Sequence, residues 1–82
     1  MKTIVFTDKA TKLFDALPAD VQAAIEKALA KYAIDRTGDV KKLHGVKDIY
    51  RMRVGRYRVF LTEDHGVIHV LYAGKRETTT YN

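Results

Sequence analysis

Basic side chains are concentrated in one short segment of this 82-residue chain. Residues 1–35 hold five lysines against five acids, so the whole formal net charge of +5 lies in residues 36–82. Within residues 41–58 a single acid, Asp48, faces seven basic side chains: Lys41, Lys42, Lys47, Arg51, Arg53, Arg56 and Arg58. Such a cluster attracts polyanions, RNA or DNA above all. A solvated basic surface without a partner would have the same composition, so charge alone leaves both interpretations open.

The arginines near the end of this segment have the spacing of strand residues. Residues 50–54 and 57–61 each alternate apolar and basic or aromatic side chains at a period of two, which is typical of strands with one buried face. Gly55-Arg56 separates the two runs and suits a two-residue hairpin loop with glycine first. This loop predicts that Arg53 stands opposite Arg58 on the neighbouring strand.

The same register divides the other side chains between the two faces of the sheet. The remaining predicted pairs are Val54 with Tyr57, Met52 with Val59, Arg51 with Phe60, and Tyr50 with Leu61. The apolar pairs must face the core, so Arg51, Arg53 and Arg58 share the opposite surface, which we call the arginine face. Opposed like charges weaken strand pairing, whereas guanidinium groups bind phosphate oxygens in bidentate fashion. We therefore predict an anion site there; a plain solvent-exposed sheet face is the alternative.

The three histidines provide little evidence for metal chemistry. Residues 67–73 form an apolar strand in which Ile68, Val70 and Tyr72 match the core parity, and this places His69 on the arginine face. A lone histidine on a strand is more often structural than catalytic. His44 lies in the basic segment and His65 in a turn, and neither has metal-ligand spacing. Without cysteine, disulfides and thiolate sites are excluded, and no metal or cofactor is expected.

The elements that must position these residues can be read along the whole chain. Residues 3–6 predict a short strand, and Thr7 is a suitable N-cap for a first helix with an apolar stripe. Pro18 ends that helix and opens a second, and the charged stretch after Gly38 predicts a loop. A turn at residues 63–66 then precedes the last strand, which Gly74 interrupts. The expected fold is α+β, with an N-terminal strand, two helices and an antiparallel β-meander whose one face the helices cover. Residues 1–82 are expected to form one domain.

The sequence also favours a cytoplasmic location. No apolar run is long enough for a membrane span. The N-terminal residues continue directly into a charged segment, so they do not have the pattern of a signal peptide.

Two motifs resemble a known family. Lys42-Leu43-His44-Gly45, followed by residues 50–59 with the sequence Tyr-Arg-Met-Arg-Val-Gly-Arg-Tyr-Arg-Val, is similar to the central pattern of the RelE/ParE toxin superfamily. Gly74-Lys75-Arg76-Glu77, with Tyr81 beyond it, resembles the tail of the RelE branch. The resemblance covers essentially the whole chain. It implies a RelE/ParE-like fold and a toxin of a type II toxin–antitoxin pair that cuts mRNA in the ribosomal A site. A ParE-like inhibitor of DNA gyrase and a non-toxic RNA-binding family member are the alternatives.

The resemblance also assigns roles to individual residues. The catalytic group that it implies comprises Arg51, Arg53, Arg58, Arg76 and Tyr81. The RNA-binding residues that we predict are Lys41, Lys42, His44, Lys47, Arg56, His69 and Lys75. The implied reaction needs no metal, because the RNA 2′-hydroxyl attacks the neighbouring phosphate while Arg58 and Arg76 stabilise the added negative charge. The resemblance further implies a cognate antitoxin that wraps the helices and the basic surface.

One departure from the family pattern concerns proton transfer. RelE-type members often carry lysines where this chain has Arg51 and Arg53, and a lysine could act as general base. An arginine stays protonated up to about pH 12, so another group such as His69 or the ribosome must assist, or the nuclease is weak. The spacing from Gly74 to Tyr81 is also one residue shorter than in longer relatives.

Overall fold

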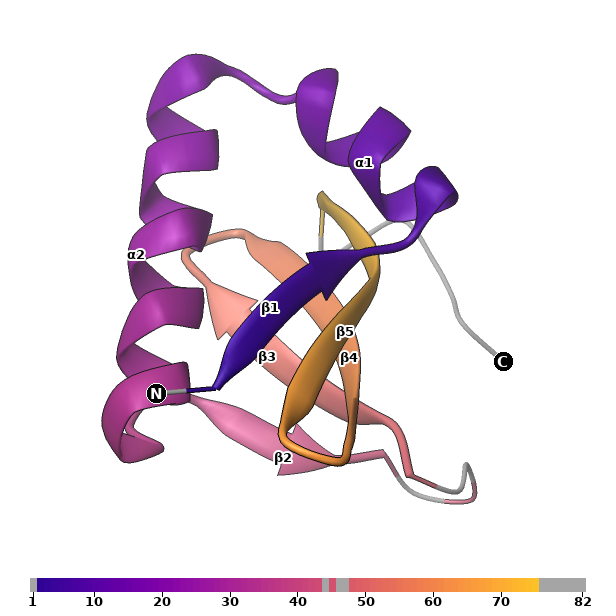
Figure 1. Ribbon diagram of the computed structural model, residues 1–82. Coiled ribbons are helices and arrows are strands. Elements are labelled where there is room, and N and C mark those ends of the chain that lie inside the picture. Colours follow the sequence, from indigo (N-terminus) through magenta and orange to yellow (C-terminus); the bar gives the residue numbers. More distant parts are fainter. Residues whose placement is uncertain (1, 44, 46–47, 76–82) are drawn as a thin grey trace.

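The computed structural model describes residues 2–43, 45 and 48–75 (Figure 1). Its elements follow the predicted order of one strand, two helices and a run of strands. They are β1 (Thr3–Phe6), α1 (Asp8–Asp15), α2 (Ala19–Asp35), β2 (Val40–Lys42), β3 (Tyr50–Val54), β4 (Tyr57–Asp64) and β5 (Val67–Lys75). The predicted α+β class is confirmed.

All the strands belong to one five-stranded sheet with the order β1-β5-β4-β3-β2. Strands β2 to β5 form an antiparallel meander, while β1 lies parallel to β5 at the sheet edge. The prediction of a loop after Gly38 was wrong in part, because Val40–Lys42 pairs with β3 as a short edge strand. Its three residues include two lysines and carry almost no strand signal of their own; the pairing of Val40 with Met52 supplies the apolar contact.

The helix boundaries follow from local hydrogen bonds. Thr7 caps α1 as predicted, since its Oγ1 accepts a hydrogen bond from the Ala10 backbone N–H at 3.1 Å. Pro18 immediately precedes α2, and its carbonyl accepts from the backbone N–H groups of Val21 and Gln22 at 3.0 Å each. The Gln22 side chain donates back to the Phe14 carbonyl at 2.9 Å, which joins the end of α1 to the start of α2.

The hairpin register is the one predicted from its loop. Gly55 has φ +59°, a left-handed conformation that favours glycine at the first loop position. The pairs Val54–Tyr57 and Arg53–Arg58 follow, and the rest of β3 pairs with β4 as expected. The turn between β4 and β5 is tighter than predicted and comprises only His65-Gly66.

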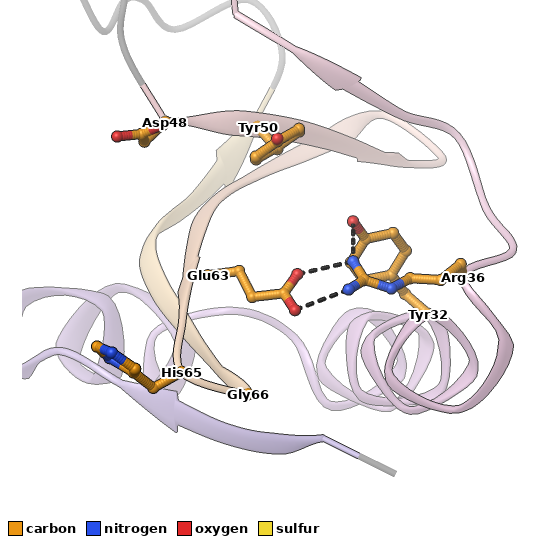
Figure 2. Close-up of a pocket in the computed structure, with 7 residues that line it drawn as sticks. All are labelled: Tyr32, Arg36, Asp48, Tyr50, Glu63, His65 and Gly66. Carbon is orange, nitrogen blue, oxygen red and sulfur yellow. Dashed lines mark hydrogen bonds and ion pairs between the residues drawn. The ribbon is translucent and has the colours of Figure 1, made fainter.

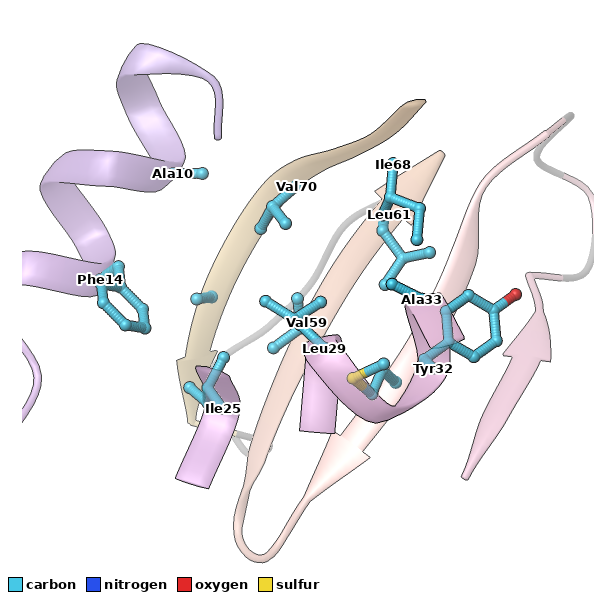
Figure 3. Packing of buried hydrophobic residues seen from close by; sticks show 12 residues of the cluster. Ala10, Phe14, Ile25, Leu29, Tyr32, Ala33, Val59, Leu61, Ile68 and Val70 are labelled. Carbon is cyan, nitrogen blue, oxygen red and sulfur yellow. The ribbon is translucent and has the colours of Figure 1, made fainter. Parts of the chain in front are cut away.

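Both helices pack on one face of the sheet, as expected (Figure 3). The strands contribute a buried apolar row of Met52, Val59, Leu61, Ile68, Val70 and Ala73. The helices contribute Ala10, Phe14, Ile25, Leu29, Tyr32 and Ala33. This surface, which we call the helix face, contains the main core, so the side chains of opposite parity on the strands point away from the helices.

A β-bulge in β5 overturns one prediction about parity. Phe60 pairs with Tyr72 but the next residue, Leu61, pairs with Val70, so Leu71 is an extra residue in β5. The extra residue reverses the parity beyond it, so Ala73 faces the core and Tyr72 lies on the arginine face, contrary to the prediction. Gly74 does not interrupt the strand, since β5 continues to Lys75.

Within the described ranges, neither helix has the length and apolar character needed to cross a membrane.

Candidate nucleic-acid interface

The register brings four basic residues together on the arginine face. Arg53 stands directly opposite Arg58, and Arg51 stands opposite Phe60 on one side and Lys41 on the other. Lys41 was predicted to lie in a loop, and the formation of β2 is what aligns it with Arg51. Three adjacent strands therefore contribute cations to one continuous surface on the side away from the helices.

The three arginine side chains differ in how far they are exposed to solvent. Arg53 is exposed, whereas Arg51 and Arg58 are half-buried and each has its Nε atom fully buried without a hydrogen-bond partner. The terminal nitrogens of Arg51 and Arg58 are not among the buried unpaired atoms. Their stems thus lie against the sheet while the ends of their guanidinium groups reach the surface.

No carboxylate neutralises these arginines in the part of the chain that the structure describes. The ion pairs there involve Lys2, Arg36 and His65 only. Cations held together without counter-charges repel each other, and they create a positive potential that favours a phosphate group. This surface therefore has the electrostatic character that the anion-site prediction requires.

An aromatic pair that sequence reasoning did not select lies at the centre of the arginine face. Phe60 is only 3% exposed although its parity places it opposite the helix face. Its ring centroid is 5.4 Å from that of Tyr72. A Cβ atom at Gly74 would lie 2.5 Å from the Tyr72 hydroxyl oxygen, so the absence of a side chain at Gly74 makes room for this ring. The parity of Phe60 was already visible in the sequence, whereas the bulge hid that of Tyr72.

The other predicted RNA-binding residues divide into two groups. His69 lies on the arginine face as predicted, opposite Thr62 and Val5. The Thr62 row is four steps along β4 from the Arg58 row, a distance of about 13 Å at ~3.3 Å per residue. Arg56 is exposed in the hairpin loop.

Lys42 and Lys75 do not join the arginine face. They pair with Tyr50 and Tyr57 respectively, whose parity is that of the helix face, and both lysines are exposed. The remaining predicted site residues, His44, Lys47, Arg76 and Tyr81, lie outside the described residues. The structure therefore places Arg51, Arg53 and Arg58 together, and the rest of the predicted catalytic group stays a prediction.

A second polar site lies at the other end of the sheet (Figure 2). Glu63 accepts two hydrogen bonds from Arg36, each 2.7 Å long, and forms an ion pair with Lys2 at 2.7 Å. Arg36 also donates to the Tyr32 hydroxyl at 2.9 Å. We call Lys2, Arg36 and Glu63 the ion cluster, and two of its members, Arg36 and Glu63, border an open cavity of about 370 Å³. Sequence reasoning missed this cluster, since nothing in the spacing of its members links them.

The ion cluster has clear effects on titration. Hydrogen bonds from Arg36 and then Lys2 lower the pKa of Glu63 below its usual value. The hydrogen bond to Glu63 raises the pKa of Arg36. Within the described residues, no three histidine, aspartate or glutamate side chains gather as a metal site would require.

Comparison with solved structures identifies the fold. The chain is similar to the isolated E. coli RelE toxin, with 25% sequence identity and a TM-score of 0.79 over 96% of this chain and 88% of that one. The RelE chain of a RelE–RelB complex from Pyrococcus horikoshii gives 23% identity and a TM-score of 0.77 over 95% and 98% of the two chains. YoeB from Staphylococcus aureus gives 20% identity and a TM-score of 0.74 over 94% and 98%. Neither a protein-family model nor a curated protein sequence matches the chain.

These observations define a small α+β protein in which the sheet face away from the helices is basic. The solved neighbours confirm the resemblance to the RelE/ParE superfamily, and the chain has the RelE-like toxin fold.

Proposed function

We propose that this chain is the toxin of a type II toxin–antitoxin system and that it cuts mRNA on the ribosome. The observation that carries the proposal is the arginine face, where Arg51, Arg53 and Arg58 share one surface without a neutralising carboxylate among the described residues. A protein under selection for stability alone gains nothing from two arginines opposite each other. An RNA phosphate between them would turn the repulsion into two sets of charge-assisted hydrogen bonds.

The proposed reaction consumes no water and needs no metal. The RNA 2′-oxygen forms a bond to the adjacent phosphorus, and the bond from phosphorus to the 5′-oxygen of the next nucleotide breaks. The products are a 2′,3′-cyclic phosphate and a free 5′-hydroxyl, which takes up a proton. Arg53 and Arg58 would bind the phosphate oxygens as they gain charge, and Arg76 and Tyr81 are assigned to the same site by resemblance.

Proton removal from the 2′-hydroxyl is the step for which the arginines are unsuited, because an arginine stays protonated up to about pH 12. His69 lies about 13 Å along the sheet from the row of Arg58. A general base must come within hydrogen-bond reach of its proton, so His69 could contact RNA but not serve this phosphate as base. We propose that the ribosome with its bound mRNA supplies the proton acceptor or aligns the 2′-hydroxyl.

We also propose a cognate antitoxin as the partner. Several solved neighbours with the same fold are complexes of RelE with RelB. A chain with a net charge of +5 and an unneutralised basic surface is suited to an acidic or amphipathic peptide that orders as it binds.

The test is to express the chain and map mRNA 5′ ends on translating ribosomes. The proposal predicts new ends that carry 5′-hydroxyl groups at ribosome-occupied codons. Arrested growth with intact mRNA would contradict it, and a loss of supercoiling by purified DNA gyrase in the presence of the chain would then favour gyrase inhibition. Normal growth with a correctly folded chain would favour a non-toxic RNA-binding protein.

A further inference from the structure

The arginine face has an apolar centre that is separate from the main core. We infer that Phe60 is a positioning residue, which holds Arg51 and Arg58 in the arrangement that binds phosphate. The inference rests on the proposed function for its biological meaning. Its physical content, that an aromatic side chain fixes two guanidinium groups, can be tested without any cleavage assay.

The burial of Phe60 is the first observation. Arg53 and Val5 on this same face are exposed, and Arg51 and Arg58 are half-buried. Phe60 is 3% exposed, and it does not belong to the cluster beneath the helices. Phe60 therefore has an apolar site of its own on the arginine face, separate from the main core.

The arginines flank Phe60 on two sides. Arg51 is its direct partner on β3, and Arg58 precedes it by two residues on the same strand and face. Directly opposed residues on neighbouring strands have Cβ atoms only about 4.5–5.5 Å apart. The buried Nε atoms of Arg51 and Arg58 show that both stems lie down on the sheet instead of extending into solvent. At these positions the two stems are the nearest neighbours of Phe60 on β3 and β4 on this face.

Tyr72 closes the third side of Phe60. The two rings are tilted by 36° with centroids 5.4 Å apart. Tyr72 also extends over Gly74, where a Cβ atom would meet its hydroxyl oxygen at 2.5 Å. Gly74 is the partner of Arg58 across the β4–β5 ladder, so the Tyr72 ring occupies the space beside Arg58. Phe60 thus contacts the Tyr72 ring and lies on the same face as its neighbours Arg51 and Arg58.

This arrangement explains why two arginines accept buried Nε groups without hydrogen bonds. A free arginine side chain has many rotamers, and fixing them only on binding would weaken the interaction with RNA. An aromatic ring beside the aliphatic stems of two arginines gives them an apolar surface to pack against, and we expect this to restrict both arginines before the ligand arrives. The terminal nitrogens remain available at the surface for phosphate oxygens.

The experiment compares Phe60→Leu with Leu61→Val in the full chain. Leu61 is equally buried on the same strand but faces the helices, so its truncation tests for a general loss of packing. Arginine Nε–Hε signals are followed by NMR, and their hydrogen exchange is measured. Phe60→Leu is expected to speed exchange about tenfold or more at Arg51 and Arg58 and to leave the already exposed Arg53 unchanged. Leu61→Val is expected to leave all three signals unchanged.

The functional part of the experiment uses the same variants on translating ribosomes. Two quantities are measured separately: the cleavage rate at saturating ribosome concentration, and the ribosome concentration that gives half of that rate. Phe60→Leu is expected to lower the saturating rate about 10- to 100-fold, because small displacements of transition-state contacts have effects of this size. Leu61→Val is expected to keep that rate.

Gly74→Ala is a second variant that displaces the Tyr72 ring without removing a charge or an apolar group of the main core. It provides the same test if Phe60→Leu does not fold, and faster exchange at Arg58 is expected. Unchanged exchange at Arg51 and Arg58 in a folded variant would overturn the inference. Faster exchange in the variants, together with a native chain that cuts no mRNA, would support the positioning role and contradict the proposed function instead.

Discussion

The arginine face and the ion cluster differ in whether their cations are paired with a carboxylate. In the ion cluster Lys2 and Arg36 each contact the carboxylate of Glu63 at 2.7 Å, and the pair ties the end of α2 to β4. On the arginine face Arg51, Arg53 and Arg58 share a surface, and no carboxylate of the described residues pairs with them. Among the described residues, the cations that join elements of the fold are thus paired with a carboxylate, whereas Arg51, Arg53 and Arg58 on the open sheet face are not.

This difference has an energetic meaning. A surface ion pair contributes about 0–1 kcal/mol to stability, whereas opposed like charges on neighbouring strands reduce stability by roughly a fraction of a kcal/mol. A buried donor without a partner costs about 1–3 kcal/mol, and the Nε atoms of Arg51 and Arg58 are two such donors. The arginine face therefore lowers the stability of the free protein, and an anion bound to the terminal nitrogens would remove the part of this cost that comes from charge repulsion.

The largest expected effect is on cleavage. Arg58→Gln keeps a long side chain at this position but removes the charge, and it should lower mRNA cleavage on ribosomes about 10²–10³-fold. Arg36→Gln is the matched control, since it removes one positive charge from the ion cluster, and it should cut mRNA at the native rate. Circular dichroism must show that both variants fold. Equal losses of cleavage activity in the two variants would mean that the overall positive charge matters and the location of Arg58 on the arginine face does not.

The next effect concerns salt. If Arg51, Arg53 and Arg58 each bind one phosphate of single-stranded RNA, the affinity should fall about 20-fold between ~50 mM and ~200 mM salt. Fluorescence anisotropy with a 2′-deoxy-substituted, non-cleavable oligonucleotide measures this dependence. Arg53→Gln should reduce the slope by about 0.7, the value for one lost phosphate contact. An unchanged slope would contradict a role for Arg53 in RNA binding.

A smaller effect of opposite sign is expected for stability. Arg53→Thr removes the repulsion with Arg58 and places a β-branched residue in a strand, so the free energy of unfolding should rise by about 0.3–1 kcal/mol. Urea denaturation of the purified chain measures this change. A loss of stability would show that the arginine pair is a structural contact and not a ligand site.

The smallest effect is the pH dependence of the ion cluster. Folding lowers the pKa of Glu63, so the carboxylate contributes stability above its unfolded pKa and loses that contribution as the pH falls through its folded pKa. Glu63→Gln lacks this term. The difference in melting temperature between the native chain and the variant should therefore shrink from about pH 6 to about pH 3. A constant difference would mean that the charge of Glu63 does not contribute.

The sequence was most informative where local geometry determines long-range contacts. The two-residue loop at Gly55-Arg56 fixed the register of the whole hairpin, because a turn of given length allows one pairing. Thus the placement of Arg53 opposite Arg58 followed from the sequence alone. The capping role of Thr7 was predictable for the same reason, since it depends on neighbours within one helical turn.

Other features depend on partners that the local sequence does not specify. The short strand β2 forms because Val40 finds Met52, and the bulge at Leu71 has no signature in the apolar pattern. Because of that one extra residue, Tyr72 lies on the arginine face, where the absence of a side chain at Gly74 makes room for its ring. The ion cluster joins residues that are far apart in the chain, and many acids could have paired with Arg36.

The most direct test of the account is an NMR titration of the arginine Nε–Hε signals with the non-cleavable RNA oligonucleotide. Arg51, Arg53 and Arg58 should shift together in proportion to the bound fraction, while Arg36 in the ion cluster should stay in place. Shifts at Arg36, or RNA binding that leaves the three arginines of the open face unperturbed, would contradict the claim that this face is the nucleic-acid site.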